Sequence, residues 1–231
     1  MIKVYPYEQL GRANHGWLDA RHHFSFAGYY NPERMGFGTL RVINDDIIKA
    51  GRGFDTHPHK NMEIITYVRK GAISHQDSNG NKGKTKAGDV QVMSAGTGVY
   101  HSEFNHESTD TNIFQIWIEP AENDVEPAWD SHEFPQRAST DALELLVSGD
   151  GSAPLQIHAD AFIYAGYMKS GSQIHHPVKR QAYVLVSEGE VMINDFSAKT
   201  GDGVEVTDLT AITLSAVTDS RFLVLDVPSV H

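Results

Sequence analysis

The sequence predicts an all-β chain with two tandem β domains, and three observations support this. Short alternating or β-branched runs recur between Gly, Asn, Asp and Pro, whereas long helical periodicity is hard to find. A proline-bearing segment separates two sets of such runs. Glycine signals in the first half also recur in the second. Each domain is therefore expected to be a sandwich or barrel.

The first set comprises six predicted strands, at residues 38–43, 63–69, 72–76, 90–93, 99–104 and 113–119. Asn79-Gly80 lies between polar flanks and predicts a type I′ hairpin turn, in which both central residues take positive φ. The second set is predicted at residues 143–148, 162–168, 182–187, 190–194, 211–215 and 222–227.

The segment 120–137 is expected to cross between the domains, because Pro120, Pro127 and Pro135 pair poorly in a sheet. The predicted domains are residues 1–130 and 131–231.

An internal repeat follows from subtraction. Gly71 recurs as Gly189, 118 residues later, and the pair Gly88-Asp89 recurs as Gly201-Asp202, 113 residues later. The smaller offset fits a shorter hairpin in the second copy. A duplicated β domain is the preferred interpretation, and a chance recurrence of Gly-Asp pairs is the alternative.

Composition excludes several classes of protein. The 231 residues contain 13 His and no Cys, so disulfides, thiolate metal sites and cysteine nucleophiles are impossible. A formal net charge of -11 makes nucleic acid and anionic membranes poor partners. With no basic and apolar leader and no long apolar run, we expect a soluble cytoplasmic protein.

Histidine spacing suggests a metal site. In an extended segment His57 and His59 project from the same face of one strand, and His101 and Glu103 repeat that spacing. Three imidazoles and one carboxylate suit a divalent transition metal better than calcium or magnesium. Taken singly, each histidine could instead lie on the surface or be satisfied in the core. The adjacent pair His22-His23 and the single residues His75 and His106 lack ligand spacing.

The surrounding runs resemble a known family. The segment Gly51 to Glu63, with the wording His-Pro-His, resembles the first cupin motif, and Gly88 to Glu103, with Gly-Asp-Val-Gln and His-Ser-Glu, resembles the second. This wording is similar to that of the pirins. The resemblance covers the first domain strongly and the second mainly in strand layout. It implies two tandem cupin (jelly-roll) barrels, with few short helices and one metal site in the N-terminal barrel.

The resemblance also implies a ligand set, in which His57, His59, His101 and Glu103 hold one divalent transition metal (iron, nickel, copper, manganese, cobalt or zinc). Many cupins use the position of Glu63 instead. Here Glu63 is expected to be structural or to support the ligands, with a ligand role as the alternative.

The repeat offsets indicate what became of a second site. They place His175 and Pro177 at the positions of the first motif's histidines, and Leu214 and Ala216 at those of the second motif's ligands. His175 and His176 are adjacent, so their rings should point to opposite faces of a strand. We expect the C-terminal domain to be a metal-free support.

For function, the resemblance implies a quercetin 2,3-dioxygenase, which cleaves the heterocyclic ring of a flavonol with dioxygen and releases carbon monoxide. Glu103 would accept the proton of the flavonol 3-hydroxyl. The alternative is a non-enzymatic pirin, regulatory or redox-sensing, that binds a protein partner. A sugar-isomerase-like cupin is disfavoured, because no basic phosphate-binding cluster lies at the motifs. Candidates for a pocket wall are Phe37, Phe54, Met93 and Phe114, with core packing as the more ordinary role of each.

Overall fold

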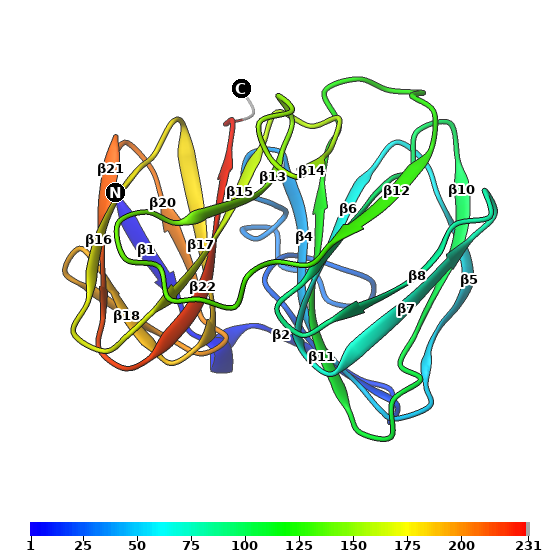
Figure 1. Cartoon of the computed structure of the whole chain (residues 1–231), viewed down its shortest axis with the longest axis horizontal. Helices are drawn as coiled ribbons and strands as arrows, with labels where there is room; N and C mark the ends of the chain where they lie inside the picture. Colours follow the sequence, from blue (N-terminus) through cyan, green and yellow to red (C-terminus); the bar gives the residue numbers. More distant parts are fainter. Residues whose placement is uncertain (230–231) are drawn as a thin grey trace.

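The computed structural model describes residues 1–229, and it consists of two β barrels lying side by side (Figure 1). Each barrel pairs a seven-stranded sheet with a four-stranded sheet. The predicted all-β class and the two tandem barrels are confirmed. One 3-10 turn, η1 (Tyr7–Gln9), is the helical element among the described residues.

The first barrel contains sheets of order β12-β9-β6-β11-β4-β3-β2 and β5-β10-β7-β8. Its strands are β2 (Gly11–Asn14), β3 (Leu18–His22), β4 (Leu40–Ile48), β5 (Gly53–His59), β6 (Glu63–Lys70), β7 (Ala72–Asp77), β8 (Lys82–Lys86), β9 (Val90–Ser94), β10 (Val99–Phe104), β11 (Thr111–Ile118) and β12 (Ala128–His132).

The second barrel contains sheets of order β1-β20-β17-β22-β15-β13-β14 and β16-β21-β18-β19. Its strands are β1 (Ile2–Tyr5), β13 (Glu144–Ser148), β14 (Leu155–Gln156), β15 (Phe162–Met168), β16 (Gln173–Pro177), β17 (Gln181–Glu188), β18 (Glu190–Ile193), β19 (Phe196–Lys199), β20 (Gly203–Val206), β21 (Ala211–Ala216) and β22 (Ser220–Val227).

The N-terminal strand β1 belongs to the second barrel. It pairs antiparallel with β20, from Ile2 opposite Val206 to Tyr5 opposite Gly203. In Figure 1 this blue strand lies among the yellow to red strands of the C-terminal half. The chain therefore contributes its first strand to the second barrel and then builds the first barrel. The predicted division into residues 1–130 and 131–231 does not account for this crossing.

The internal repeat is confirmed by backbone geometry. Gly71 and Gly189 end corresponding strands with φ of 78° and 82°, and Gly88 and Gly201 have φ of 89° and 86°. The amide of Gly88 donates to the carbonyl of Val68, and that of Gly201 donates to the carbonyl of Val186, each at 2.8 Å. Because these left-handed positions favour glycine, the repeated glycines mark one turn used twice.

Three sequence predictions were wrong. The segment 120–137 was expected not to pair, but β12 pairs antiparallel with β9, from Ala128 opposite Ser94 to His132 opposite Val90. This is possible because all three prolines lie outside β12, which forms the edge of its sheet. The turn at Asn79-Gly80 is not type I′, since Gly80 has φ of 88° but Asn79 is not among the positive-φ residues of the described chain.

The predicted strand at 38–43 is also too short, because β4 continues to Ile48. The residues Asn44, Asp45 and Asp46 are poor strand formers, and the predicted strand ends before them. All three are buried. Their partners and surroundings, described below, explain why a strand tolerates them.

The interface between the barrels is a shared apolar core. One cluster of buried residues combines Leu40, Ile43 and Phe114 of the first barrel with Tyr183 and Leu225 of the second. Among residues 1–229 no helix is long and apolar enough to cross a membrane.

Polar contacts reinforce this interface. Arg69 of β6 donates to the main-chain oxygen of Ser187 at 2.5 Å and also pairs with Asp45, with 2.5 Å between Nη1 and Oδ2. Asp45 of β4 thus takes part in the junction between the barrels.

Candidate metal centre and its cavity

Three histidines converge where β5 and β10 pair. His101 lies directly opposite His57 in the antiparallel register, and His59 lies two residues further along the same strand as His57. Their Nε2 or Nδ1 atoms all lie within 4.8 Å of one another, which makes them a group that could hold a metal ion. The predicted alternation of His57 and His59 on one face is confirmed, and the sheet supplies the third imidazole.

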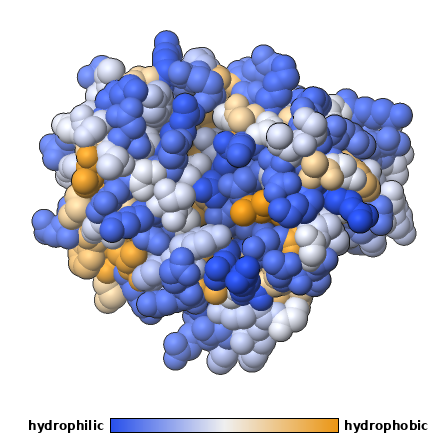
Figure 2. Space-filling view, turned by 90° about the horizontal axis from the view of Figure 1, so that it is seen from below, coloured by the Kyte–Doolittle hydropathy of each residue, from blue (hydrophilic) through white to orange (hydrophobic). Residues whose placement is uncertain are grey.

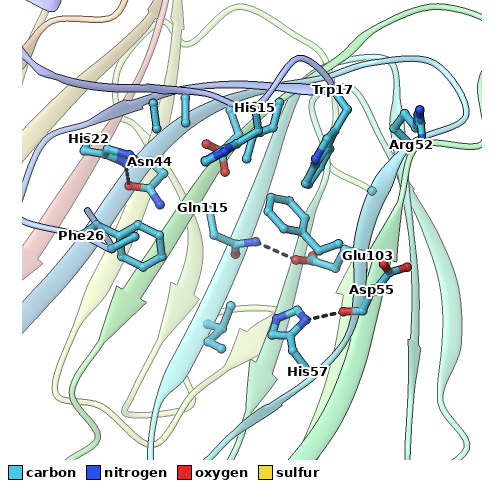
Figure 3. A pocket seen from close by; sticks show the side chains of 18 of the residues that line it. His15, Trp17, His22, Phe26, Asn44, Arg52, Asp55, His57, Glu103 and Gln115 are labelled. Atoms are coloured by element: carbon cyan, nitrogen blue, oxygen red, sulfur yellow. Dashed lines mark hydrogen bonds between the residues drawn. The ribbon is translucent and has the colours of Figure 1, made fainter. Parts of the chain in front are cut away.

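Hydrogen bonds on the outer nitrogens orient two of these rings. His57 Nδ1 lies 2.7 Å from the main-chain oxygen of Asp55 (Figure 3), so Nδ1 carries the proton and Nε2 is free to accept. Behind His101, its Nδ1 lies 3.5 Å from Nδ1 of His75, whose Nε2 lies 2.9 Å from Oδ2 of Asp77. The Asp77 carboxylate accepts from His75, which leaves the His75 Nδ1 as the acceptor for His101.

The donor set fits a cation. The Nε2 atoms of His57 and His101 face each other at 3.1 Å, and both are lone-pair acceptors in the tautomers just described. Adjacent ligands about 2.1 Å from an octahedral ion lie about 3.0 Å apart. Burial lowers the pKa of His59 to about 4 and that of His101 to about 3, with neighbouring imidazoles adding to the shift. Neutral imidazoles at this spacing are suited to bind a transition metal.

The Glu103 carboxylate faces the same cavity from β10. Gln91 Nε2 donates to its Oε1 at 2.7 Å, Gln115 Nε2 donates to its Oε2 at 2.7 Å (Figure 3), and Thr66 Oγ1 lies 3.1 Å from Oε1. These bonds hold a buried carboxylate in one orientation. Glu103 is not part of the three-histidine group defined by the 4.8 Å spacing, and its ligand role stays a prediction.

Glu63 points elsewhere. Its side chain is completely buried, and Oε2 accepts hydrogen bonds from Ser94 Oγ at 2.7 Å and from the amide of His158 at 3.1 Å. His158 belongs to the second barrel, so Glu63 connects the barrels. It is absent from the cavity lining and from the histidine group. This agrees with the structural role expected for Glu63.

At the corresponding place in the second barrel, β16 turns its two histidines to opposite faces, as expected. His175 is exposed and its Nδ1 lies 2.9 Å from Thr213 Oγ1, whereas His176 is buried against Tyr164, with 4.7 Å between ring centroids. Leu214 and Ala216 are buried in an apolar cluster. The residue that faces inward is therefore His176, not the His175 that the repeat offset selects, because the register of β16 differs by one position.

A cavity of about 990 Å³ opens beside the three histidines. Of the four proposed wall residues, Phe54 lines it, while Phe37, Phe114 and Met93 are buried in the core clusters. Further walls come from Trp17, Phe26, Ile64 and Trp117, and the polar residues His22, Asn44 and Asp46 lie on one side. Figure 3 shows His15 and Arg52 near Trp17. The face of the molecule that is seen from below in Figure 2 is mostly hydrophilic, with hydrophobic residues in small separate areas.

Sequence reasoning missed the polar residues that support this site. Thr66, Gln91 and Gln115 each interrupt an apolar strand and face the barrel interior, where they bond Glu103. Their signal was present: a polar residue flanked by apolar residues in a strand with a buried face. His75 was set aside for lack of ligand spacing, and it lies behind His101 as a supporting partner.

Two barrels of the same architecture, the first with a histidine cluster beside a large cavity, define a bicupin with a candidate metal centre in its first barrel. Family comparison agrees: residues 4–118 match Pirin, and residues 145–227 match the Quercetinase C-terminal cupin domain. The chain belongs to the pirin family.

Similar proteins extend over the full length. The quercetin 2,3-dioxygenase of Escherichia coli K12 is 45% identical and covers 100% of both chains. A pirin-like protein of Caulobacter vibrioides is 46% identical over 98% of this chain and 99% of its own. The crystal structure of the bacterial pirin YhhW from E. coli in complex with nickel(II) superposes with a TM-score of 0.93, at 44% identity and 100% coverage of both chains.

Proposed function

We propose that this chain is a quercetin 2,3-dioxygenase, a metal-dependent enzyme that opens the heterocyclic ring of the flavonol with dioxygen and releases carbon monoxide. The observation that carries the proposal is the convergence of three imidazoles beside an amide-held carboxylate on the wall of an aromatic-lined cavity of about 990 Å³. Cavities of this size accommodate small aromatic ligands. The E. coli relative bearing that name is 45% identical.

In this proposal His57, His59, His101 and Glu103 hold one divalent transition metal per chain: iron, nickel, copper, manganese, cobalt or zinc. Nickel is supported by the similar E. coli structure that contains it. When bound, the ion supplies Lewis acidity and open positions for oxygen ligands.

The protein residues then have separate tasks. Glu103 accepts the proton of the flavonol 3-hydroxyl, and the amides of Gln91 and Gln115 keep its two oxygens oriented while it does so. Phe54 and Trp117 line the cavity and offer apolar faces to the flat rings of the substrate.

The alternative is a non-enzymatic regulator in which the metal controls binding to a protein partner. Such a regulator would need the histidine cluster but not a substrate-sized cavity behind it. The cavity therefore favours the enzyme.

The test is loss of quercetin absorbance under air. Protein is assayed as purified, after stripping with chelator, and after separate reloading with each metal, with metal content measured alongside. Turnover restored by one ion and abolished in His57→Ala supports the enzyme. Bound metal without turnover under every loading would contradict it and favour the regulator.

A further inference from the structure

Asp46 is a buried acid that faces the cavity without a protein partner. It lies on β4, lines the cavity, and is 3% exposed. Its Oδ1 is buried and accepts no hydrogen bond within the described residues 1–229. An unpartnered buried carboxyl oxygen is costly, which indicates that something outside the protein chain bonds it.

The neighbours of Asp46 cannot supply that bond. In the sheet register Asp46 lies between Ala20 of β3 and Ile113 of β11, both apolar and buried. Paired residues point to the same face, so the carboxyl group is flanked by hydrocarbon on both sides.

The polar side chains of the next row along the sheet are engaged elsewhere. Asn44 Oδ1 lies 2.7 Å from His22 Nδ1, and Gln115 Nε2 donates to Glu103. The ion pair of Arg69 is with Asp45, the residue before Asp46. Asn44, Gln115 and Asp45 thus all have partners, and the Asp46 carboxyl group remains available to a ligand inside the cavity.

We propose that the Asp46 carboxyl group determines substrate specificity by exchanging hydrogen bonds with a ring hydroxyl of a polyphenolic substrate. This inference rests on the proposed function, since the 3-hydroxyl of the flavonol would then be at Glu103 and a second hydroxyl on one of its rings would reach Asp46. The substrate class is a flavonol with ring hydroxyls beyond the one at the metal.

The direction in which the pKa of Asp46 is shifted agrees with this role. Burial raises the pKa of Asp46 well above its usual value, and the nearby carboxylates of Asp45 and Glu103 add to the shift. A neutral carboxyl group both donates and accepts, as a phenolic hydroxyl does, so the two groups can bond reciprocally. A site built to bond a hydroxyl discriminates against ligands that lack it.

The test is anaerobic binding to nickel(II)-loaded protein, followed by quenching of tryptophan fluorescence, because Trp17 and Trp117 line the cavity. The two probes are quercetin and 3-hydroxyflavone, which keeps the chelating hydroxyl but lacks the other ring hydroxyls. The natural protein should prefer quercetin by about tenfold or more in Kd, corresponding to at least one hydrogen bond. In Asp46→Ala that preference should fall by about tenfold, because quercetin binding weakens while 3-hydroxyflavone binding does not.

Asp46→Asn is the matched variant, since a neutral amide of the same shape both donates and accepts. It should keep a preference within about threefold of the natural protein. An equal preference for quercetin in Asp46→Ala and in the natural protein would overturn the inference. Turnover of quercetin in air by the natural protein would still support the proposed function. If the nickel-loaded natural protein binds neither flavonol, both fail.

Infrared difference spectra provide a readout that does not depend on the alanine variant. The natural protein should show a carboxylic acid carbonyl band that is absent in Asp46→Asn. That band should shift on addition of quercetin and stay in place with 3-hydroxyflavone. No shift with quercetin would overturn the inference.

Discussion

His75 Nε2 lies 2.9 Å from Asp77 Oδ2, and both side chains are buried behind His101. This pair sets the tautomer of His75, and through the His75 Nδ1 atom, 3.5 Å away, it sets the proton position on His101. A histidine that lacks ligand spacing in the sequence thereby orients a candidate ligand.

His75→Phe should weaken metal binding about 10-fold to 100-fold, because His101 loses the acceptor that holds its ring. Phenylalanine keeps a flat ring against Trp129, whose indole stacks on His75 at 4.9 Å between centroids. Affinity is measured by competition with a chromophoric chelator. His106→Phe is the matched control, because the exposed His106 stacks on Phe104 away from the cluster. Equal affinity in both variants would show that His75 has no role in orienting His101.

Glu103→Ala should lose both metal and flavonol turnover, with activity falling about 100-fold or more. It should also destabilise the metal-free protein by about 1–3 kcal/mol, since the amides of Gln91 and Gln115 lose their acceptor in a buried site. Metal content by mass spectrometry and thermal unfolding measure the two effects.

Glu63→Ala is the contrasting variant for Glu103→Ala. It should lower stability, because Ser94 and the amide of His158 lose their acceptor, but retain the metal. Full metal retention with normal activity in Glu103→Ala would refute the ligand assignment, and loss of metal in Glu63→Ala would support the alternative ligand.

His23 should make stability depend on pH. It is buried at the barrel interface with Nδ1 2.9 Å from the Tyr183 hydroxyl, and burial lowers its pKa to about 3, with Arg34 adding to the shift. Between about pH 6.5 and that value the unfolded state binds a proton that the folded state does not. This contribution to stability is therefore complete above about pH 6.5 and is lost as pH falls toward 3.

The measurement is urea unfolding at several pH values for the natural protein and His23→Gln. Above about pH 6.5 the free energy of unfolding of the variant should be lower by a constant amount, because the hydrogen bond between His23 and Tyr183 is lost. Below about pH 6.5 the stability of the variant should fall less steeply than that of the natural protein. Parallel pH profiles for the two proteins would show that His23 does not carry this dependence, since the other buried histidines are common to both.

Arg69→Met should destabilise the protein by about 3–5 kcal/mol, because Asp45 is left as an unpaired buried carboxylate. The variant also loses the bonds from Arg69 to Ser187 that join the barrels. Unfolding followed by fluorescence and by circular dichroism should separate into two transitions if these bonds couple the barrels. Lys49→Met, which removes an exposed pair with Asp110, should stay within about 1 kcal/mol of the natural protein.

The sequence by itself determined the features that depend on local periodicity. Strand alternation places His57 with His59 and His101 with Glu103 on shared faces, and the paired glycines at 71 and 189 mark the duplicated turn. It also determined that the second barrel cannot repeat the ligand set, because Leu214 and Ala216 offer no donor atoms.

Only the tertiary structure decided which strands pair and in which register. It placed His101 opposite His57, moved His75 behind His101, and carried β4 through three polar residues. It also attached the N-terminal strand β1 to the second barrel. The physical reason is that propensity and alternation act within a strand. The partners that stabilise a buried polar side chain such as Asp46, or leave it free for a ligand, come from strands distant in the chain.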